Sequence, residues 1–351
     1  MHQRLDDFGG LLNWERLSVW IDANALPGSG PPTQVEKLKG GSQNNLFRIW
    51  RNSESFVLRR PPLHPRPNSN ATIVREGRIL KALAETAVPH PRLYAVCEDL
   101  SVIGVNFYAM TPLEGFSPMG ELIGAYDTDG MWREKMGVEL AHAAASLGAV
   151  DYMAVGLADL GNPKDWHSRQ VSRWQSQLQG YSDLPNYGGH TLKHVEEIGR
   201  WLEDHVPKTG RIGIMHGDLQ FPNVMFSLLS PRISGVIDWE LATLGDPLLD
   251  LGIILSSWWE DGDPEGKQPM VRPWNNFISR SELVRLYGAA SGRDMSEMPW
   301  YFCLACFRQA CIIEGTYARA KAGQASLETG ERLHAYAQRL LSLAKRIKES
   351  G

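Results

Sequence analysis

The chain has 351 residues, of which 43% are hydrophobic and 22% charged, with a formal net charge of -4 and a pI near 6.2. This length exceeds what a single core comfortably accommodates, so we expect two lobes. The negative charge argues against a nucleic-acid binder. We also expect no membrane partner, because no stretch approaches the roughly 20 apolar residues that span a bilayer. The polar start MHQRLDDFGG lacks the apolar region of a signal peptide, so we expect a cytoplasmic protein.

The first predicted lobe covers residues 1–113 and alternates strands with helices. A helix is expected at about 13–25, and the run LPGSGPPT then reads as a linker. Three strand patterns follow, in VEKLKGG, NLFRIW and SFVLRR. A helix is predicted in ATIVREGRILKALAET, and strands are predicted in RLYAVCED and VNFYAMT. This order predicts a small antiparallel sheet with one main helix.

The second predicted lobe, residues 114–351, is mainly helical. Long helical patterns are expected at residues 131–150, 165–181, 191–205, 247–259, 280–290, 298–322 and 333–350. Three short apolar runs interrupt them, RIGIM, NVMFS and ISGVIDW. We therefore predict an α+β protein whose second lobe carries a small strand insert around residues 211–239.

The cysteines do not form a recognisable metal or disulfide pattern. Cys303 and Cys306 have CxxC spacing, but no second pair and no nearby histidine completes a zinc set. Together with Cys311 they lie on an apolar segment at helical spacing, which predicts a buried helix.

The segment IMHGDLQFPNV places polar groups in a loop between two apolar runs. The spacing from Asp218 to Asn223 lets a tight loop return the amide to the carboxylate. A second carboxylate, Asp238, ends the run ISGVIDW. A few oxygen ligands suit Mg²⁺, which binds through one or two carboxylates together with substrate phosphates. The alternative for Asp218 is a loop aspartate that makes an Asx-turn.

The pattern of His216-Gly217-Asp218, Asn223 and Ile237-Asp238-Trp239 resembles a known family. It is similar to the catalytic and metal-binding loops of the aminoglycoside phosphotransferase and choline kinase branch of the protein-kinase-like fold, whose protein-kinase relatives carry H-R-D-L-x-x-x-N and D-F-G. The resemblance implies a bilobal fold that uses Mg²⁺ and ATP or GTP.

The resemblance also implies a role for each residue of these loops. Asp218 would be the catalytic residue, which accepts or orients the proton of the acceptor hydroxyl, and Asn223 and Asp238 would hold Mg²⁺. His216, which follows two apolar residues, is interpreted as structural support for the loop. Asp250 lies in an otherwise apolar helix, where a buried carboxylate would brace the 216–223 loop.

In the first lobe, the predicted nucleotide contacts begin with a glycine turn and a strand. Gly40, Gly41 and Ser42 lie between two strands, where backbone N–H groups would cover phosphates, although a plain turn is the alternative. Strand alternation puts Val57 and Arg59 on one face. By the resemblance, Val57 packs on adenine and Arg59 replaces the phosphate-contacting lysine, with Arg60 left open as an alternative.

Three further first-lobe residues follow from the resemblance. Glu76 matches the helix glutamate that pairs with the phosphate-contacting cation, and a solvated helix charge is its alternative. Thr111 and Leu113 lie in the segment that resembles the adenine-binding hinge. The run VLRRPP resembles the branch whose kinase-like domain is fused to acyl-CoA dehydrogenases.

These observations favour a small-molecule kinase that transfers phosphate from a nucleoside triphosphate to a hydroxyl of a small substrate. The alternatives are a kinase-fold protein that binds nucleotide or a partner without turnover, and a metal-dependent hydrolase at His216, Asp218 and Asp238. The identity of the phosphate acceptor stays open. The stretch WWEDGDPE combines aromatic and acidic residues that would suit a cationic acceptor, and a solvated loop is its alternative. The run VLRRPP points instead to acyl-type substrates. The oligomeric state is left open.

Overall fold

The computed structural model describes residues 8, 10–38, 44–266 and 268–350, which form two compact units. Unit 1 comprises residues 1–115, 155–157 and 234–240, and unit 2 comprises residues 116–154, 158–233 and 241–351. The first stretch of unit 1 thus ends two residues beyond the boundary expected at Leu113, and it gains the segment that carries Asp238.

Unit 1 contains a five-stranded antiparallel sheet in the order β1-β2-β3-β5-β4. Its strands are β1 (Gln34–Lys37), β2 (Asn45–Arg51), β3 (Glu54–Arg60), β4 (Leu93–Cys97) and β5 (Phe107–Met110). Its helices are α1 (Trp14–Ala23), α2 (Ser69–Leu83) and α3 (Leu100–Ile103), and the later segment adds most of β9 (Ile233–Val236) and the 3-10 helix η4 (Trp239–Leu241). The strands and the longer helices confirm the sequence prediction, whereas the short α3 was not predicted.

The register of the sheet is set by a tight turn between β2 and β3. Arg51 pairs with Glu54, so only Asn52 and Ser53 lie between the strands. Asn52 has φ +55°, a conformation that asparagine tolerates better than most residues and that suits a two-residue hairpin. The turn fixes which side chains of β3 lie on each face.

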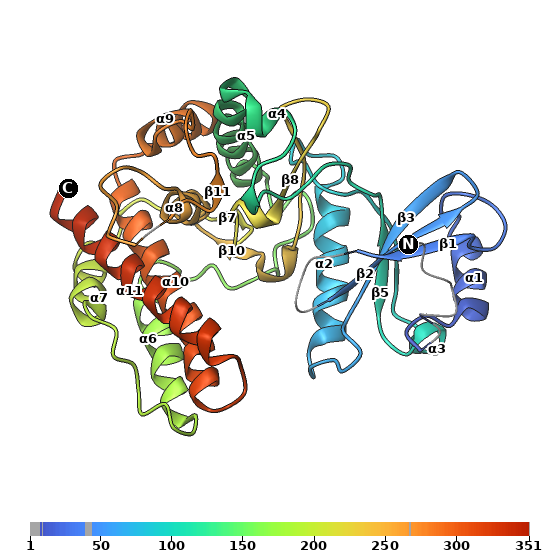
Figure 1. The fold of residues 1–351 in the computed structure, drawn as a ribbon, viewed down its shortest axis with the longest axis horizontal. Helices are drawn as coiled ribbons and strands as arrows, with labels where there is room; N and C mark the ends of the chain where they lie inside the picture. The colour runs from blue at the N-terminus through green and yellow to red at the C-terminus, as the bar shows by residue number, and fades with distance from the viewer. Residues whose placement is uncertain (1–7, 9, 39–43, 267, 351) are drawn as a thin grey trace. The chain divides into compact units, whose positions relative to one another are not determined.

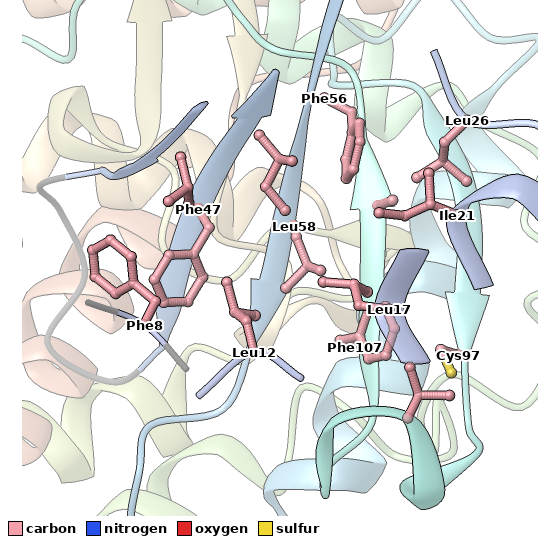
Figure 2. Close-up of a cluster of buried hydrophobic side chains, with 14 residues drawn as sticks. Phe8, Leu12, Leu17, Ile21, Leu26, Phe47, Phe56, Leu58, Cys97 and Phe107 are labelled. Atoms are coloured by element: carbon pink, nitrogen blue, oxygen red, sulfur yellow. The ribbon is translucent and has the colours of Figure 1, made fainter. Parts of the chain in front are cut away.

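One face of this sheet packs into an apolar core with α1 and α3. Figure 2 shows Leu17 and Ile21 of α1 beside Phe56 and Leu58 of β3, and all four side chains are fully buried. Residues 57 and 59 of β3 therefore lie on the opposite face, on which α2 packs against β4 and β5. The alternation predicted from SFVLRR is confirmed.

Unit 2 is mostly helical (Figure 1). Its helices are α4 (Ala125–Thr128), α5 (Gly130–Gly148), α6 (Gln170–Gly180), α7 (Val195–Asp204), α8 (Leu248–Ser257), α9 (Arg280–Ser291), α10 (Met298–Lys321) and α11 (Leu327–Ser350), with the 3-10 helices η2 (Tyr181–Asp183) and η3 (Phe221–Asn223). Its strands are β6 (Gly120–Glu121), β7 (Gly213–Met215), β8 (Val224–Phe226), β10 (Thr243–Gly245) and β11 (Val271–Arg272). The predicted helix at 165–181 starts later, at Gln170, and the short α4 was not predicted.

Helix α10 forms the centre of unit 2, packed against α11, α8 and α6. Cys303, Cys306 and Cys311 are free and buried on this helix, which confirms the interpretation of the CxxC spacing as helical packing. No helix in the described part of the chain is long and apolar enough to cross a membrane.

Candidate functional site

In unit 2, the loop that follows β7 carries Asp218. Antiparallel pairing of β7 with β10 ends with Met215 opposite Thr243, and the chain then turns at Gly217. Gly217 has φ +82°, and a Cβ at this position would lie 2.8 Å from the carbonyl oxygen of Leu241. Only glycine adopts this conformation at no steric cost, so the position requires glycine.

Two side-chain amides hold the carboxylate of Asp218. The Asn223 amide nitrogen donates to Oδ2 of Asp218 at 2.8 Å and to its backbone oxygen at 2.8 Å. Gln220 Nε2 donates to Oδ1 at 2.7 Å. The helix η3, with Pro222 in its first turn, brings Asn223 back to the loop. The carboxylate is therefore fixed in orientation, and the carbonyl oxygen is the atom of Asn223 suited to bind a cation.

Asp250, on α8, lies beneath this loop. Its Oδ2 accepts the backbone N–H of His216 at 2.7 Å, and its Oδ1 accepts that of Gly217 at 2.8 Å. Burial raises the pKa of Asp250, and the nearby His216 and these two N–H groups counteract it. His216 is fully buried, and its Nδ1 accepts the backbone N–H of Asp218 at 3.3 Å. Both side chains act on the loop through its backbone.

In unit 1, Arg59 connects two carboxylates. Its Nε lies 2.8 Å from Oε2 of Glu76 on α2, and its Nη2 donates to Oδ1 of Asp238 at 2.8 Å. Arg59 and Glu76 are buried, and Tyr108 donates its hydroxyl to Oε2 of Glu76 at 2.9 Å. Arg60 lies on the other face of β3 and donates to the carbonyl of Leu11. Arg59, and not Arg60, therefore shares a face with Glu76.

These carboxylates change the protonation of their neighbours. Burial by itself would lower the pKa of Arg59, but Tyr108, Glu76 and Asp238 raise it above its usual range, so the guanidinium stays charged. Burial raises the pKa of Glu76, against the attraction of Arg59. Burial and the charge of Asp238 raise the pKa of Glu240 to about 6.

The backbone of Asp238 has φ +65°, an unusual value for a residue with a side chain. The buried Trp239 follows and donates its indole N–H to the carbonyl of Val236 at 3.0 Å. Arg75 of α2 donates to the carbonyl of Glu240 at 3.2 Å. These contacts hold a sharp turn that leaves about a third of the Asp238 side chain exposed, at 34%.

The structure describes only some of the other residues that were predicted to contact the nucleotide. Gly40, Gly41 and Ser42 lie outside the described residues. Val57 is buried on the same face of β3 as Arg59. The backbone N–H of Thr111 donates to the carbonyl of Arg92 at 2.8 Å, so this N–H is already engaged within the fold. Leu113 is partly buried and lies close to Gly235.

Comparison with known families gives a match over most of the chain. The model described as the Phosphotransferase enzyme family, APH, matches residues 34–301. The chain belongs to this phosphotransferase family.

The curated relatives that this chain matches are longer proteins. The chain is 31% identical over 329 residues to the probable acyl-CoA dehydrogenase IBR3 of Arabidopsis thaliana, covering 87% of this chain and 39% of that protein. It is 27% identical over 321 residues to acyl-CoA dehydrogenase family member 10 of Mus musculus, covering 89% of this chain and 29% of the relative. The chain therefore spans roughly a third of the length of these two relatives.

Solved structures show the same kinase-like fold. A putative aminoglycoside phosphotransferase from Ralstonia eutropha JMP134 is 30% identical, with a TM-score of 0.79 and coverage of 95% of this chain and 98% of the other. A choline kinase from Cryptosporidium parvum is 11% identical, with a TM-score of 0.58 and coverage of 90% and 89%. The second likeness shows the fold alone. The predicted protein-kinase-like fold and family are confirmed.

One buried polar cluster of this phosphotransferase was not assigned a role from the sequence. Asp246 is fully buried, and its carboxylate accepts hydrogen bonds from Arg293 at 3.0 Å and from the Tyr301 hydroxyl at 2.8 Å, with His167 Nε2 at 3.3 Å. In the sequence, Asp246 lies between Gly245 and Pro247, just before α8. Its partners lie 79, 47 and 55 residues away, so local spacing did not reveal them.

Proposed function

We propose that this phosphotransferase is a small-molecule kinase that transfers the γ-phosphate of a magnesium-bound nucleoside triphosphate, ATP or GTP, to a hydroxyl of a small substrate. The observation that carries the proposal is the Asp218 carboxylate held by the amides of Asn223 and Gln220. A base fixed in this way can receive a proton from a hydroxyl without first reorganising.

In the proposed reaction, the acceptor oxygen attacks the γ-phosphorus, and the bond from that phosphorus to the β–γ bridging oxygen breaks. Asp218 orients the hydroxyl and receives its proton. The products are a phosphate monoester and a nucleoside diphosphate. Arg59, kept charged by Glu76 and Asp238, would contact the phosphates. Val57 and the 111–113 segment would contact adenine.

Asn223 and Asp238 each have the oxygen-donor chemistry that magnesium prefers. Asn223 donates through its amide nitrogen to Asp218, which leaves its carbonyl oxygen as a ligand, and Asp238 offers a partly exposed carboxylate. A bound magnesium ion neutralises phosphate charge and lowers the barrier to transfer. Among the described residues, no group of three or more His, Cys, Asp or Glu side chains is arranged to hold a metal. This donor set suits an ion carried in with substrate phosphates, and supports a kinase over the hydrolase alternative.

Thermal unfolding of the purified chain with ATP or GTP, each with and without Mg²⁺, tests this proposal. A ligand that binds the native state raises the midpoint by mass action. We expect a rise that depends on Mg²⁺, followed by phosphate transfer in a screen of hydroxylated acceptors. No rise at millimolar nucleotide would contradict the proposal and favour a kinase-fold protein that binds a partner without turnover. We further propose the cytoplasm as its location.

A further inference from the structure

Tyr108 of β5 lies on the face of the sheet against which α2 packs. Its neighbours in the strand, Phe107 and Ala109, belong to the apolar core on the opposite face, so strand alternation places Tyr108 away from that core. Antiparallel pairing of β3 with β5 sets Tyr108 directly opposite Arg59. Side chains of opposite residues in such a pair lie on the same face and close together. Tyr108 is therefore a direct neighbour of the proposed phosphate-contacting arginine.

Helix α2 approaches this part of the sheet closely at Gly77. A Cβ at Gly77 would lie 2.6 Å from Cγ2 of Val96 on β4, so a larger residue would force the helix away from the sheet. Because Glu76 precedes Gly77, the close approach brings a carboxylate down to the sheet, where it is 1% exposed. The packing of α2 thus delivers Glu76 to both Arg59 and Tyr108.

The Glu76 carboxylate receives groups from both strands. Nη2 of Arg59 donates to Oε1 of Glu76 at 3.2 Å, and Nε of Arg59 lies 2.8 Å from Oε2. The Tyr108 hydroxyl donates to the same Oε2 at 2.9 Å. The carboxylate therefore faces the guanidinium with both oxygens, and the phenol holds one of these oxygens from β5. This contact opposes rotation of the carboxylate, which would move an oxygen away from the guanidinium.

Tyr108 keeps its proton and so acts as a donor to this carboxylate. The side chain is 2% exposed, and burial, together with the charge of Glu76, raises the pKa of Tyr108 well above its usual range. A phenylalanine would keep the ring but remove the donor, and a buried acceptor that loses a donor is destabilised. The hydroxyl therefore contributes something to the network that the ring alone does not.

The direction of the Arg59 guanidinium depends on where this carboxylate lies. Nη2 of Arg59 is shared between Oε1 of Glu76 at 3.2 Å and Oδ1 of Asp238 at 2.8 Å. A rotation of the Glu76 carboxylate would therefore change the position of the guanidinium that is proposed to contact the phosphates. A binding group that is already held in place loses less conformational freedom when its ligand arrives, and this preorganisation increases affinity.

We propose that Tyr108 is a positioning residue for nucleotide binding, which fixes the Glu76 carboxylate so that Arg59 is held ready to contact the phosphates. Tyr108 does not itself touch the nucleotide in this proposal, because it acts through Glu76 and Arg59. The inference rests on the proposed kinase function, in which Arg59 contacts the phosphates.

Tyr108→Phe tests the hydroxyl while preserving the ring. Isothermal titration calorimetry measures the affinity of each variant for Mg²⁺-ATP or Mg²⁺-GTP, whichever the wild type binds. We expect the Kd of Tyr108→Phe to rise about tenfold, the lower end of the loss that is typical when the partner that orients a metal ligand is removed.

Tyr187→Phe is the matched control in unit 2. The Tyr187 hydroxyl donates to Oε1 of the buried Glu314 at 2.8 Å, so this variant also removes a phenol hydroxyl from a buried carboxylate. We expect both variants to lower the midpoint of thermal unfolding, and only Tyr108→Phe to weaken nucleotide binding. The comparison separates positioning of Arg59 from a general loss of stability.

Arg59→Lys tests whether Tyr108 acts through the guanidinium. Lysine keeps the positive charge but has a single nitrogen, which cannot face both oxygens of Glu76 as the guanidinium does. We expect Tyr108→Phe to weaken nucleotide binding by less than about threefold in the Arg59→Lys background, because residues of one hydrogen-bond network have non-additive effects. The geometry that the hydroxyl maintains is already lost in that background.

Three results would overturn this inference while the proposed function survives. These are a wild-type Kd in Tyr108→Phe, an equal loss of affinity in Tyr187→Phe, and an undiminished effect of Tyr108→Phe in the Arg59→Lys background. A wild-type chain that binds neither Mg²⁺-ATP nor Mg²⁺-GTP would instead contradict the proposed function, and this inference would fail with it.

Discussion

Arg59 and Asp238 lie 179 residues apart in the chain and meet in one ion pair, with Nη2 2.8 Å from Oδ1. The same guanidinium contacts Glu76, so one buried cation links the main helix of unit 1 to the turn that carries Asp238. The proposed phosphate-contacting cation and the proposed metal ligand are thus held together within unit 1.

Asp238→Asn should abolish the Mg²⁺-dependent part of the midpoint rise that nucleotide produces. The amide is a weaker ligand than a carboxylate for a hard divalent cation. Thermal unfolding at fixed ATP and varied Mg²⁺ measures the effect. Asp204→Asn, at an exposed aspartate, is the control and should respond as the wild type does. A full Mg²⁺ response in Asp238→Asn would remove Asp238 from the metal site.

Asp218→Asn should lower kcat by a factor of about 10² to 10⁴, the range typical for loss of a general base. Nucleotide binding should persist, because the proposed phosphate and adenine contacts lie elsewhere. Steady-state transfer to the acceptor found in the screen, with the nucleotide midpoint measured in parallel, separates the two effects. Wild-type turnover in this variant would refute the assignment of Asp218.

Glu76→Gln should reduce the free energy of unfolding by about 3–5 kcal/mol, because it leaves the buried Arg59 with one carboxylate fewer. Urea unfolding of the free chain measures this change. Glu114→Gln is the matched control, since the side chain of Glu114 is 75% exposed in its pair with Arg48 and should contribute at most about 1 kcal/mol. Equal losses in the two variants would show that burial does not set the strength of the pair.

Asp246 should make the fold sensitive to acid. Burial alone would raise its pKa, but hydrogen bonds from His167 and Arg293 lower it well below the ordinary value of 3.8. A lowered pKa in the folded state means that the stabilising contribution is complete above about 4 and is lost as the pH falls further.

Asp246→Asn should therefore be less stable than the wild type at pH 7, and the difference should shrink below about pH 4. Urea unfolding at several pH values from 7 to 3 measures it. Asp204→Asn, at an exposed aspartate, is the control. A difference between wild type and Asp246→Asn that stays constant with pH would argue against a charged Asp246 in the folded state.

Local patterns in the sequence predicted most of the elements. The alternation in β3 assigned Phe56 and Leu58 to the core face and Arg59 to the other, and the structure confirms this arrangement. The five-residue interval from Asp218 to Asn223 predicted the contact between their side chains, which the structure shows at 2.8 Å. Both predictions concern residues that are close together in the sequence, so their geometry follows from their spacing along the chain.

Tertiary structure alone decided which distant groups meet. The resemblance pointed to Arg59 and left Arg60 open as the alternative, and in the folded chain Arg59 is the residue that pairs with Glu76, whereas Arg60 donates to the carbonyl of Leu11. Nor did any local pattern indicate that Arg308 of α10 lies over Trp174, 134 residues earlier. Periodicity specifies which face of an element is buried, whereas pairings between elements depend on how whole faces pack, so these distant contacts could be identified only in the folded chain.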